Sequence, residues 1–153
     1  MTAQTYAPAN VANINNIITD LAKDGIQAIE AEKFVAIGPN VDVFILDAAA
    51  IKNIKGLYQT DNTMFDTCKA WNDGEVYLEM AYNAYYTNLE IALCNTWFMA
   101  KVVYPEAFSD IDISEKLDEI TNAFLGQSLA TKIQAYPMSY GGYGKVNKET
   151  IFN

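Results

Sequence analysis

Residues 41–50 read VDVFILDAAA, and this stretch decides the fold class. Residues 41–46 are β-branched or apolar at nearly every position, which is typical of a buried strand in a parallel sheet. Asp47 stands at the carboxyl end of the predicted strand, and the alanines after it open a helix. Ligands of such folds bind at the carboxyl ends of strands, so Asp47 is a candidate binding residue.

A second strand is predicted at residues 75–80, EVYLEM, because apolar and polar side chains alternate there after an Asn-Asp-Gly turn. Helical patterns surround both strands. The chain is therefore expected to form one α/β domain over residues 1–153, with a small, mostly parallel sheet flanked by helices. An extended lead-in is expected over residues 1–10, and the pattern weakens after Leu129.

Apolar residues at helical spacing predict the helices. The expected helices cover residues 11–23, 30–37, 61–71 and 88–103. A further helix is expected between Asp112, which is a suitable N-cap residue, and Gly126, which is a suitable residue to end a helix. The side chains expected to face the core are Val11, Ile14, Ile17, Ile18 and Leu21, then Phe34 and Ile37, then Leu89, Leu93, Trp97 and Ala100, then Ile113, Leu117, Ile120 and Phe124.

The composition excludes several classes of protein. The 153 residues carry a net charge of −9, with ten lysines and neither arginine nor histidine. Without histidine there is no Ser-His-Asp triad, no imidazole base and no ordinary zinc site. Without arginine there is no bidentate phosphate clamp, and an acidic surface repels nucleic acid. We therefore expect no enzyme activity, no metal site, no cofactor and no nucleic-acid partner.

The amino-terminal sequence lacks the basic and apolar regions of a signal peptide, and the apolar stretch 91–104 is too short to span a bilayer. The two cysteines, Cys68 and Cys94, are expected to be buried free thiols. A disulfide between them requires that the fold bring their Cα atoms within about 7 Å.

The most promising candidate site is the loop at residues 82–88, YNAYYTN, between the second strand and a helix N-terminus. Tyrosine rings offer flat stacking surfaces, and phenols, amides and free helix N–H groups bind polar ligand groups. The candidate ligand-binding residues are Tyr82, Asn83, Tyr85, Tyr86 and Asn88. The alternative is that the tyrosines cover the core and that Thr87 or Asn88 only caps the helix.

Two other segments are interpreted as structural. Residues 140–145, YGGYGK, lack the spacing and the Ser or Thr of a phosphate-binding loop, and a glycine-rich turn is expected instead. The acidic residues between Asp110 and Glu119 lack the spacing of a calcium loop, and helix capping with a solvated face explains them.

Several motifs occur in an order that resembles a known family. These are residues 38–49, GPNVDVFILDAA, residues 72–126 from NDGEVYLEM to NAFLG, and residues 140–146, YGGYGKV. Together they look like the C-terminal lobe of class III substrate-binding proteins of ABC importers, which capture iron-siderophore, haem or cobalamin-type complexes. The resemblance extends from about Glu30 to Val146.

The resemblance implies two lobes with a ligand cleft between them, of which this chain has room for the second only. It implies a metal-chelate type of ligand, held at Asp47 and at the loop from Tyr82 to Tyr86 with Asn88. It also implies an ABC permease as partner, contacted through Glu90, and an extracytoplasmic location for the parent protein. Since arginine and histidine are lacking, tyrosine stacking and amide or phenol hydrogen bonds would hold the ligand.

Two origins stay open for such a chain: a fragment of a longer protein, or a natural single-lobe protein that lacks the N-terminal lobe. In the second case the exposed cleft face predicts an interaction module that self-associates as a dimer.

Overall fold

The central sheet has three strands in the order β3-β4-β5 in the computed structural model. β3 (Phe44–Asp47) and β4 (Val76–Glu79) are parallel, and β5 (Gly144–Lys145) pairs antiparallel with β4. A separate antiparallel pair joins β1 (Thr2–Ala3) to β2 (Gln27–Ala28). The structure describes residues 2–3, 7–17, 27–28, 30–83, 86–146 and 149. The predicted α/β class is confirmed, and the main sheet is mixed.

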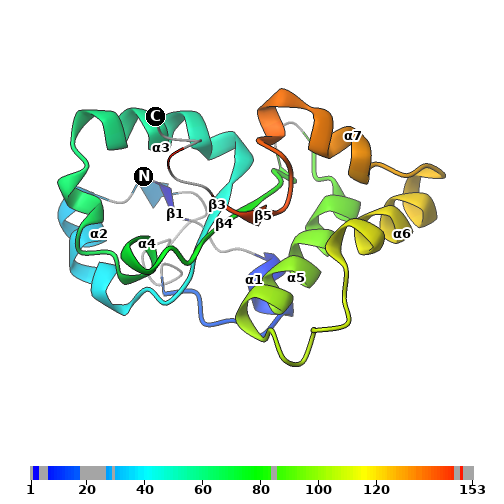
Figure 1. The fold of residues 1–153 in the computed structure, drawn as a ribbon, viewed down its shortest axis with the longest axis horizontal. Helices are drawn as coiled ribbons and strands as arrows, with labels where there is room; N and C mark the ends of the chain where they lie inside the picture. Colours follow the sequence, from blue (N-terminus) through cyan, green and yellow to red (C-terminus); the bar gives the residue numbers. More distant parts are fainter. Residues whose placement is uncertain are drawn as a thin grey trace.

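Helices lie on both sides of the sheet, as Figure 1 shows. One side carries α2 (Ala31–Ile37), α3 (Ile51–Thr60) and α4 (Lys69–Asp73). The other carries α1 (Ala7–Val11), α5 (Leu89–Val103), α6 (Ile113–Leu125) and α7 (Ala130–Ala135). Short 3₁₀ turns complete the described chain: η2 (Gly38–Asn40), η3 (Ala48–Ala50), η4 (Thr63–Phe65) and η5 (Pro137–Ser139).

An aromatic cluster fills the space between the sheet and the α2 to α4 side. The Phe65 ring lies 4.5 Å from the Trp71 ring and 5.6 Å from the Phe34 ring, centroid to centroid. Phe44 of β3 extends the cluster to the sheet, with its ring 6.1 Å from Trp71. Phe65 is fully buried, because it sits at the centre of these rings.

The opposite face of the sheet packs on α5. The Phe98 ring of α5 lies 6.3 Å from the Tyr77 ring of β4 and 5.2 Å from the Tyr143 ring, centroid to centroid. α5 in turn packs against α1 and α6. α5 therefore contacts both β4 and the segment around Tyr143 near the end of the described chain.

The two strongest helix predictions are confirmed at their ends. α6 begins where Asp112 accepts a hydrogen bond from the Glu115 N–H at 3.0 Å, and it ends at Gly126 with φ of 68°. A positive φ favours glycine, which lacks the Cβ that would clash. α5 begins after Asn88 and ends at Val103, as expected.

The predicted lead-in and first helix are wrong over the described residues. A helix already forms at α1, and Asn13, with φ of 55°, follows its end, so the chain does not continue as a helix from Val11 through Ile17. Val11 is 73% exposed rather than buried. Ile18 and Leu21 lie outside the described residues.

The predicted helix over residues 61–71 is also wrong, since η4 and α4 replace it. The Asp61 carboxylate accepts hydrogen bonds from the Thr63 N–H at 3.0 Å and from the Thr63 hydroxyl at 2.6 Å. Such local bonds to a side chain compete with the helical pattern. The first strand is shifted as well, because β3 begins at Phe44 rather than at Val41.

The buried face of α5 differs from the predicted one. Leu89 and Leu93 are 61% and 38% exposed. The buried side chains of α5 are Ile91, Cys94, Asn95, Phe98, Met99 and Ala100. Ala100 is buried as predicted and Trp97 is partly buried against the core, so the prediction was wrong at Leu89 and Leu93 only. α5 carries apolar residues on all sides and its buried face contains Asn95, so periodicity did not single out that face. In α6, Phe124 is exposed and Thr121 is buried in its place.

Both cysteines are buried free thiols, as expected. Burial raises the pKa of the Cys94 thiol to about 11, against the opposing effect of a hydrogen bond with Tyr143. Among the helices that the structure describes, none has the length and apolar character needed to cross a bilayer.

Candidate functional site

The parallel register brings two carboxylates together at the carboxyl ends of β3 and β4. Asp47 and Glu79 are direct partners across the two strands. Registered residues of parallel strands project to the same face of the sheet, so both side chains lie on the side of α5. Asp47 was predicted as a site residue, whereas Glu79 was not. The predicted strand at residues 75–80 ended at Met80, so Glu79 looked like an ordinary polar residue of the alternation.

The two carboxylates differ in their surroundings. The Asp47 carboxylate is half-buried and accepts a hydrogen bond from the Ala49 N–H at 2.7 Å, which starts η3. Burial raises the pKa of Asp47 above its ordinary value of 3.8, and the Ala49 bond acts in the opposite direction. Glu79 is only 4% exposed. The negative charge at this edge therefore sits partly inside the protein.

Tyr82 lies close enough to Asp47 and Glu79 for both acids to affect its phenol. Burial raises the pKa of its phenol, and the negative charges of Glu79 and Asp47 raise it further. The structure thus brings Asp47 and Tyr82 together, as the sequence predicted. Tyr82 is 9% exposed, so its ring belongs mainly to the core and leaves little area for stacking.

The loop after Tyr82 closes on itself at its neck. The Asn88 N–H donates to the Tyr82 carbonyl at 2.7 Å, and a β-bridge pairs Asn83 with Thr87. The Thr87 hydroxyl also donates to the Asn83 side-chain oxygen at 2.9 Å. Asn83 and Thr87 therefore shape the neck, and Tyr86 is the described residue of the tip.

The tip presents an aromatic ring to solvent. Tyr86 is 83% exposed. Tyr85, predicted as its neighbour in the site, lies outside the described residues. Tyr82 and Tyr86 thus have different surroundings: the first supports the loop, and the second is open to a ligand.

The helix after the loop carries the other predicted residues. Asn88 occupies the N-cap position of α5, but its side chain makes no capping hydrogen bond within the described residues. The structural alternative is therefore met in part: Tyr82 covers the core and Asn88 is the N-cap residue, but its amide makes no capping hydrogen bond among the described residues. Glu90 lies in the first turn of α5 and is partly exposed.

Residues 140–143 form the predicted glycine-rich turn, and a strand that was not predicted follows it. Tyr140, Gly141 and Gly142 have φ values of 50°, 95° and 87°, and β5 starts two residues later. This turn lies at the end of η5, which packs against η3 beside the carboxyl end of β3. Sequence patterns missed α7 and β5, both of which are short.

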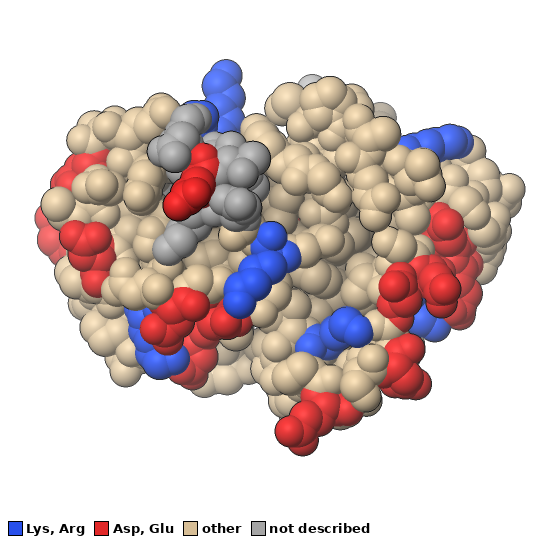
Figure 2. Space-filling model, in the orientation of Figure 1, with Lys and Arg blue, Asp and Glu red and all other residues tan. Residues whose placement is uncertain are grey.

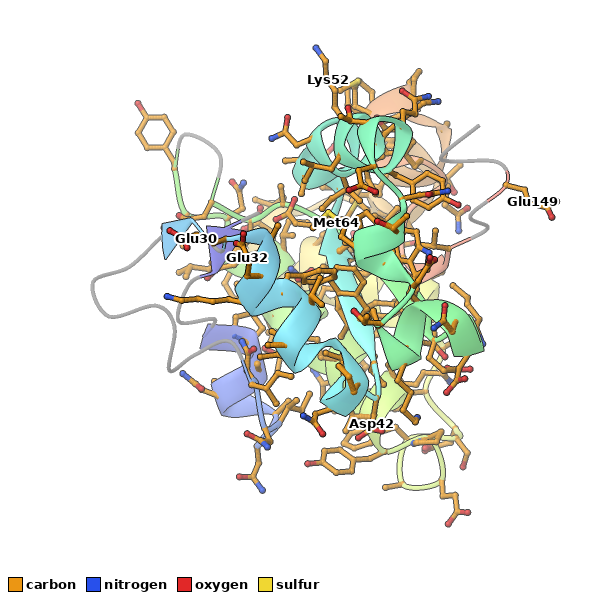
Figure 3. The ribbon with its side chains drawn as sticks, turned by 90° about the vertical axis from the view of Figure 1, so that its left-hand side faces the viewer. Glu30, Glu32, Asp42, Lys52, Met64 and Glu149 are labelled. Atoms are coloured by element: carbon orange, nitrogen blue, oxygen red, sulfur yellow. The ribbon has the colours of Figure 1, made fainter. Side chains whose placement is uncertain are left out.

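Charge is unevenly distributed over the surface. Figure 2 shows acidic side chains over α6 and the loop before it, a second acidic group on the α2 and α4 side, and lysines between the two. Figure 3 shows Asp42 and Lys52 at opposite ends of the molecule; Asp42 precedes β3 and Lys52 follows it on α3. Asp47, which ends β3, therefore lies toward the Lys52 end.

The arrangement can bind polar and aromatic groups without covalent chemistry. Across the described ranges no three residues of the His, Cys, Asp and Glu types are grouped to hold a metal ion. Two carboxylates accept hydrogen bonds, Tyr86 offers a flat ring, and Asn83 and Asn88 carry amides. No protein-family model and no curated protein matches the chain, so its function is inferred from this arrangement.

Proposed function

We propose that this chain is a solute-binding lobe of an ABC importer and takes an iron-chelate, haem or cobalamin-like ligand. One observation carries the proposal: an exposed aromatic loop lies beside paired acids at the carboxyl ends of two parallel strands. This is where α/β folds bind ligands. The parent protein would be extracytoplasmic, with an N-terminal lobe as the second half of the cleft.

The acidic side chains of the site favour contact with a neutral or cationic part of such a ligand over contact with its carboxylates. The carboxylate of Asp47 repels ligand carboxylates, so this lobe would face the neutral or cationic side of a chelate. Hydrogen-bond donors on that side can reach the Asp47 carboxylate. The flat ring of Tyr86 can stack on a planar or aromatic group, and this contact would supply much of the lobe's affinity.

The test is a titration of the chain with three probes: a ferric tris-catecholate, haemin and cyanocobalamin, followed by calorimetry. We expect at least one probe to bind, and Tyr86→Ala to weaken its affinity about two- to tenfold, as expected for the loss of one aromatic pair. Tyr136→Ala is the matched control, because Tyr136 is 60% exposed but follows α7. Equal affinities for both variants, or no binding of any probe, would contradict the proposal.

The proposed permease contact is tested separately. Glu90 is in the first turn of α5, next to the loop, and would pair with a basic residue of the permease. Glu90→Lys is expected to abolish transport by the complete importer while leaving ligand affinity unchanged. Unchanged transport would contradict this assignment.

A second candidate function is self-association. Leu89 and Leu93 are exposed and four residues apart, so they form an apolar stripe along the start of α5, and the exposed Tyr86 lies in the loop that precedes this helix. Light scattering over a wide concentration range should show dimers that Leu89→Glu disrupts. A monomer at every concentration would contradict this alternative.

A further inference from the structure

A buried asparagine lies in the interior of α5. Asn95 is fully buried, although asparagine is a poor helix former and an amide is costly to bury without partners. Both ends of its side chain make hydrogen bonds. The Nδ2 group donates to the Met80 carbonyl at 2.8 Å, and Oδ1 accepts from the Tyr143 hydroxyl at 2.6 Å.

The first bond lies where the sheet ends and the loop begins. The β3–β4 ladder ends at Glu79, and β5 pairs only with Tyr77 and Leu78. Met80 is the next residue and is buried, so its carbonyl needs a partner other than a strand. Asn95 provides that partner two residues before Tyr82, where the loop neck closes.

The hydrogen bond from Tyr143 fixes the orientation of the Asn95 amide. A phenol hydrogen donated to Oδ1 requires the amide oxygen to face Tyr143, which turns the NH₂ group toward Met80. Tyr143 reaches this position because it follows Gly141 and Gly142, whose positive φ values turn the chain. Its ring then packs against Phe98. The glycine-rich turn is thus connected to the loop by two hydrogen bonds, although Tyr143 and Asn95 are 48 residues apart.

We infer that Asn95 and Tyr143 are positioning residues that fix the loop neck, formed by Tyr82, Asn83, Thr87 and Asn88, where the chain leaves β4. They act through the Met80 backbone, because Asn95 binds the Met80 carbonyl and Tyr143 binds the Asn95 amide. As far as it concerns ligand binding, this inference rests on the proposed function. It assigns a role to the turn at residues 140–143 that its sequence does not reveal.

The test measures amide hydrogen exchange in Tyr143→Phe, which removes one hydroxyl and keeps the ring. The Asn88 N–H reports on the loop neck, since it donates to the Tyr82 carbonyl. We expect its exchange to accelerate roughly fivefold beyond any change at Ile120 in α6, as for the loss of one hydrogen bond.

Tyr77→Phe is the matched control. Tyr77 also packs on Phe98, and its hydroxyl donates to Glu75 at 2.8 Å, away from the loop. Tyr77→Phe should leave unchanged the ratio of the amide exchange rate of Asn88 to that of Ile120. An equal effect of both variants on that ratio, or no effect of Tyr143→Phe, would overturn the inference.

The exchange experiment contains no ligand. It therefore tests the positioning role of Asn95 and Tyr143 even if none of the three probes binds and the proposed function is wrong. For any probe that binds, Tyr143→Phe should weaken its affinity and Tyr77→Phe should not. A probe affinity unchanged by Tyr143→Phe would overturn the positioning role for the site.

Discussion

At the scale of single residues, Asp47 combines a fixed hydrogen bond with partial burial beside a second acid. Its folded-state pKa is raised, chiefly by burial, so the folded protein holds this proton more tightly than the unfolded chain does. The resulting contribution to stability is complete below the unfolded pKa and is lost as the pH rises through the folded pKa. At neutral pH, the ionised Asp47 therefore lowers the free energy of unfolding.

Asp47→Asn keeps an oxygen for the Ala49 N–H but cannot ionise. We expect the variant to be more stable than the parent protein at pH 7 and equal to it at a pH well below 3.8, measured by urea unfolding at each pH. Asp61→Asn is the control with the opposite sign, because hydrogen bonds from Thr63 lower the pKa of Asp61. A pH-independent difference for Asp47→Asn would contradict this account.

At the scale of elements, sequence patterns succeeded where local chemistry and burial agreed. β4 and the ends of α6 were predictable, because alternation, Asp112 and Gly126 act within a few residues. Residues 61–71 were not, since the bonds of Asp61 to Thr63 replace a helical turn. The face of α5 depends on which neighbours cover it, and that information is absent from its own sequence.

The cap of α6 gives a prediction at this scale. Asp112→Ala removes the acceptor for the Glu115 N–H and should lower the free energy of unfolding by about 0.5–2 kcal/mol. Asp110→Ala changes the net charge equally but lies outside the cap, and it should have a smaller effect in the same denaturant series. Equal losses would mean that charge, rather than capping, is responsible.

At the scale of the whole molecule, the aromatic rings form separate groups on the two sides of the sheet. The rings of Phe34, Phe44, Phe65 and Trp71 gather on the α2 to α4 side. The site, in contrast, lies at the sheet edge and on the α5 side. Its position at the strand ends could be predicted through Asp47, but its second acid and its support by Asn95 depend on register and packing between distant segments.

Phe65→Ala should cost about 3–5 kcal/mol of unfolding free energy, because it leaves a cavity among three rings. Phe124→Ala is the control, since Phe124 is 55% exposed, and its cost should be small. Thermal unfolding of both variants measures the difference. Similar losses would show that the aromatic cluster is not the main source of stability.

Contacts between segments that are far apart in the sequence affect the order in which the elements fold. β3 and β4 belong to one strand-helix-strand unit, whereas α1 must meet α5 and β5 must meet β4 across much longer stretches of chain. Closing a longer loop costs more conformational entropy and slows the approach to the transition state. We therefore expect residues 44–79 to order first and β5 to dock late. The hydroxyl of Tyr143 then reaches Asn95 only in the last stage, so the loop at 82–88 would acquire its final geometry after the rest of the sheet has formed.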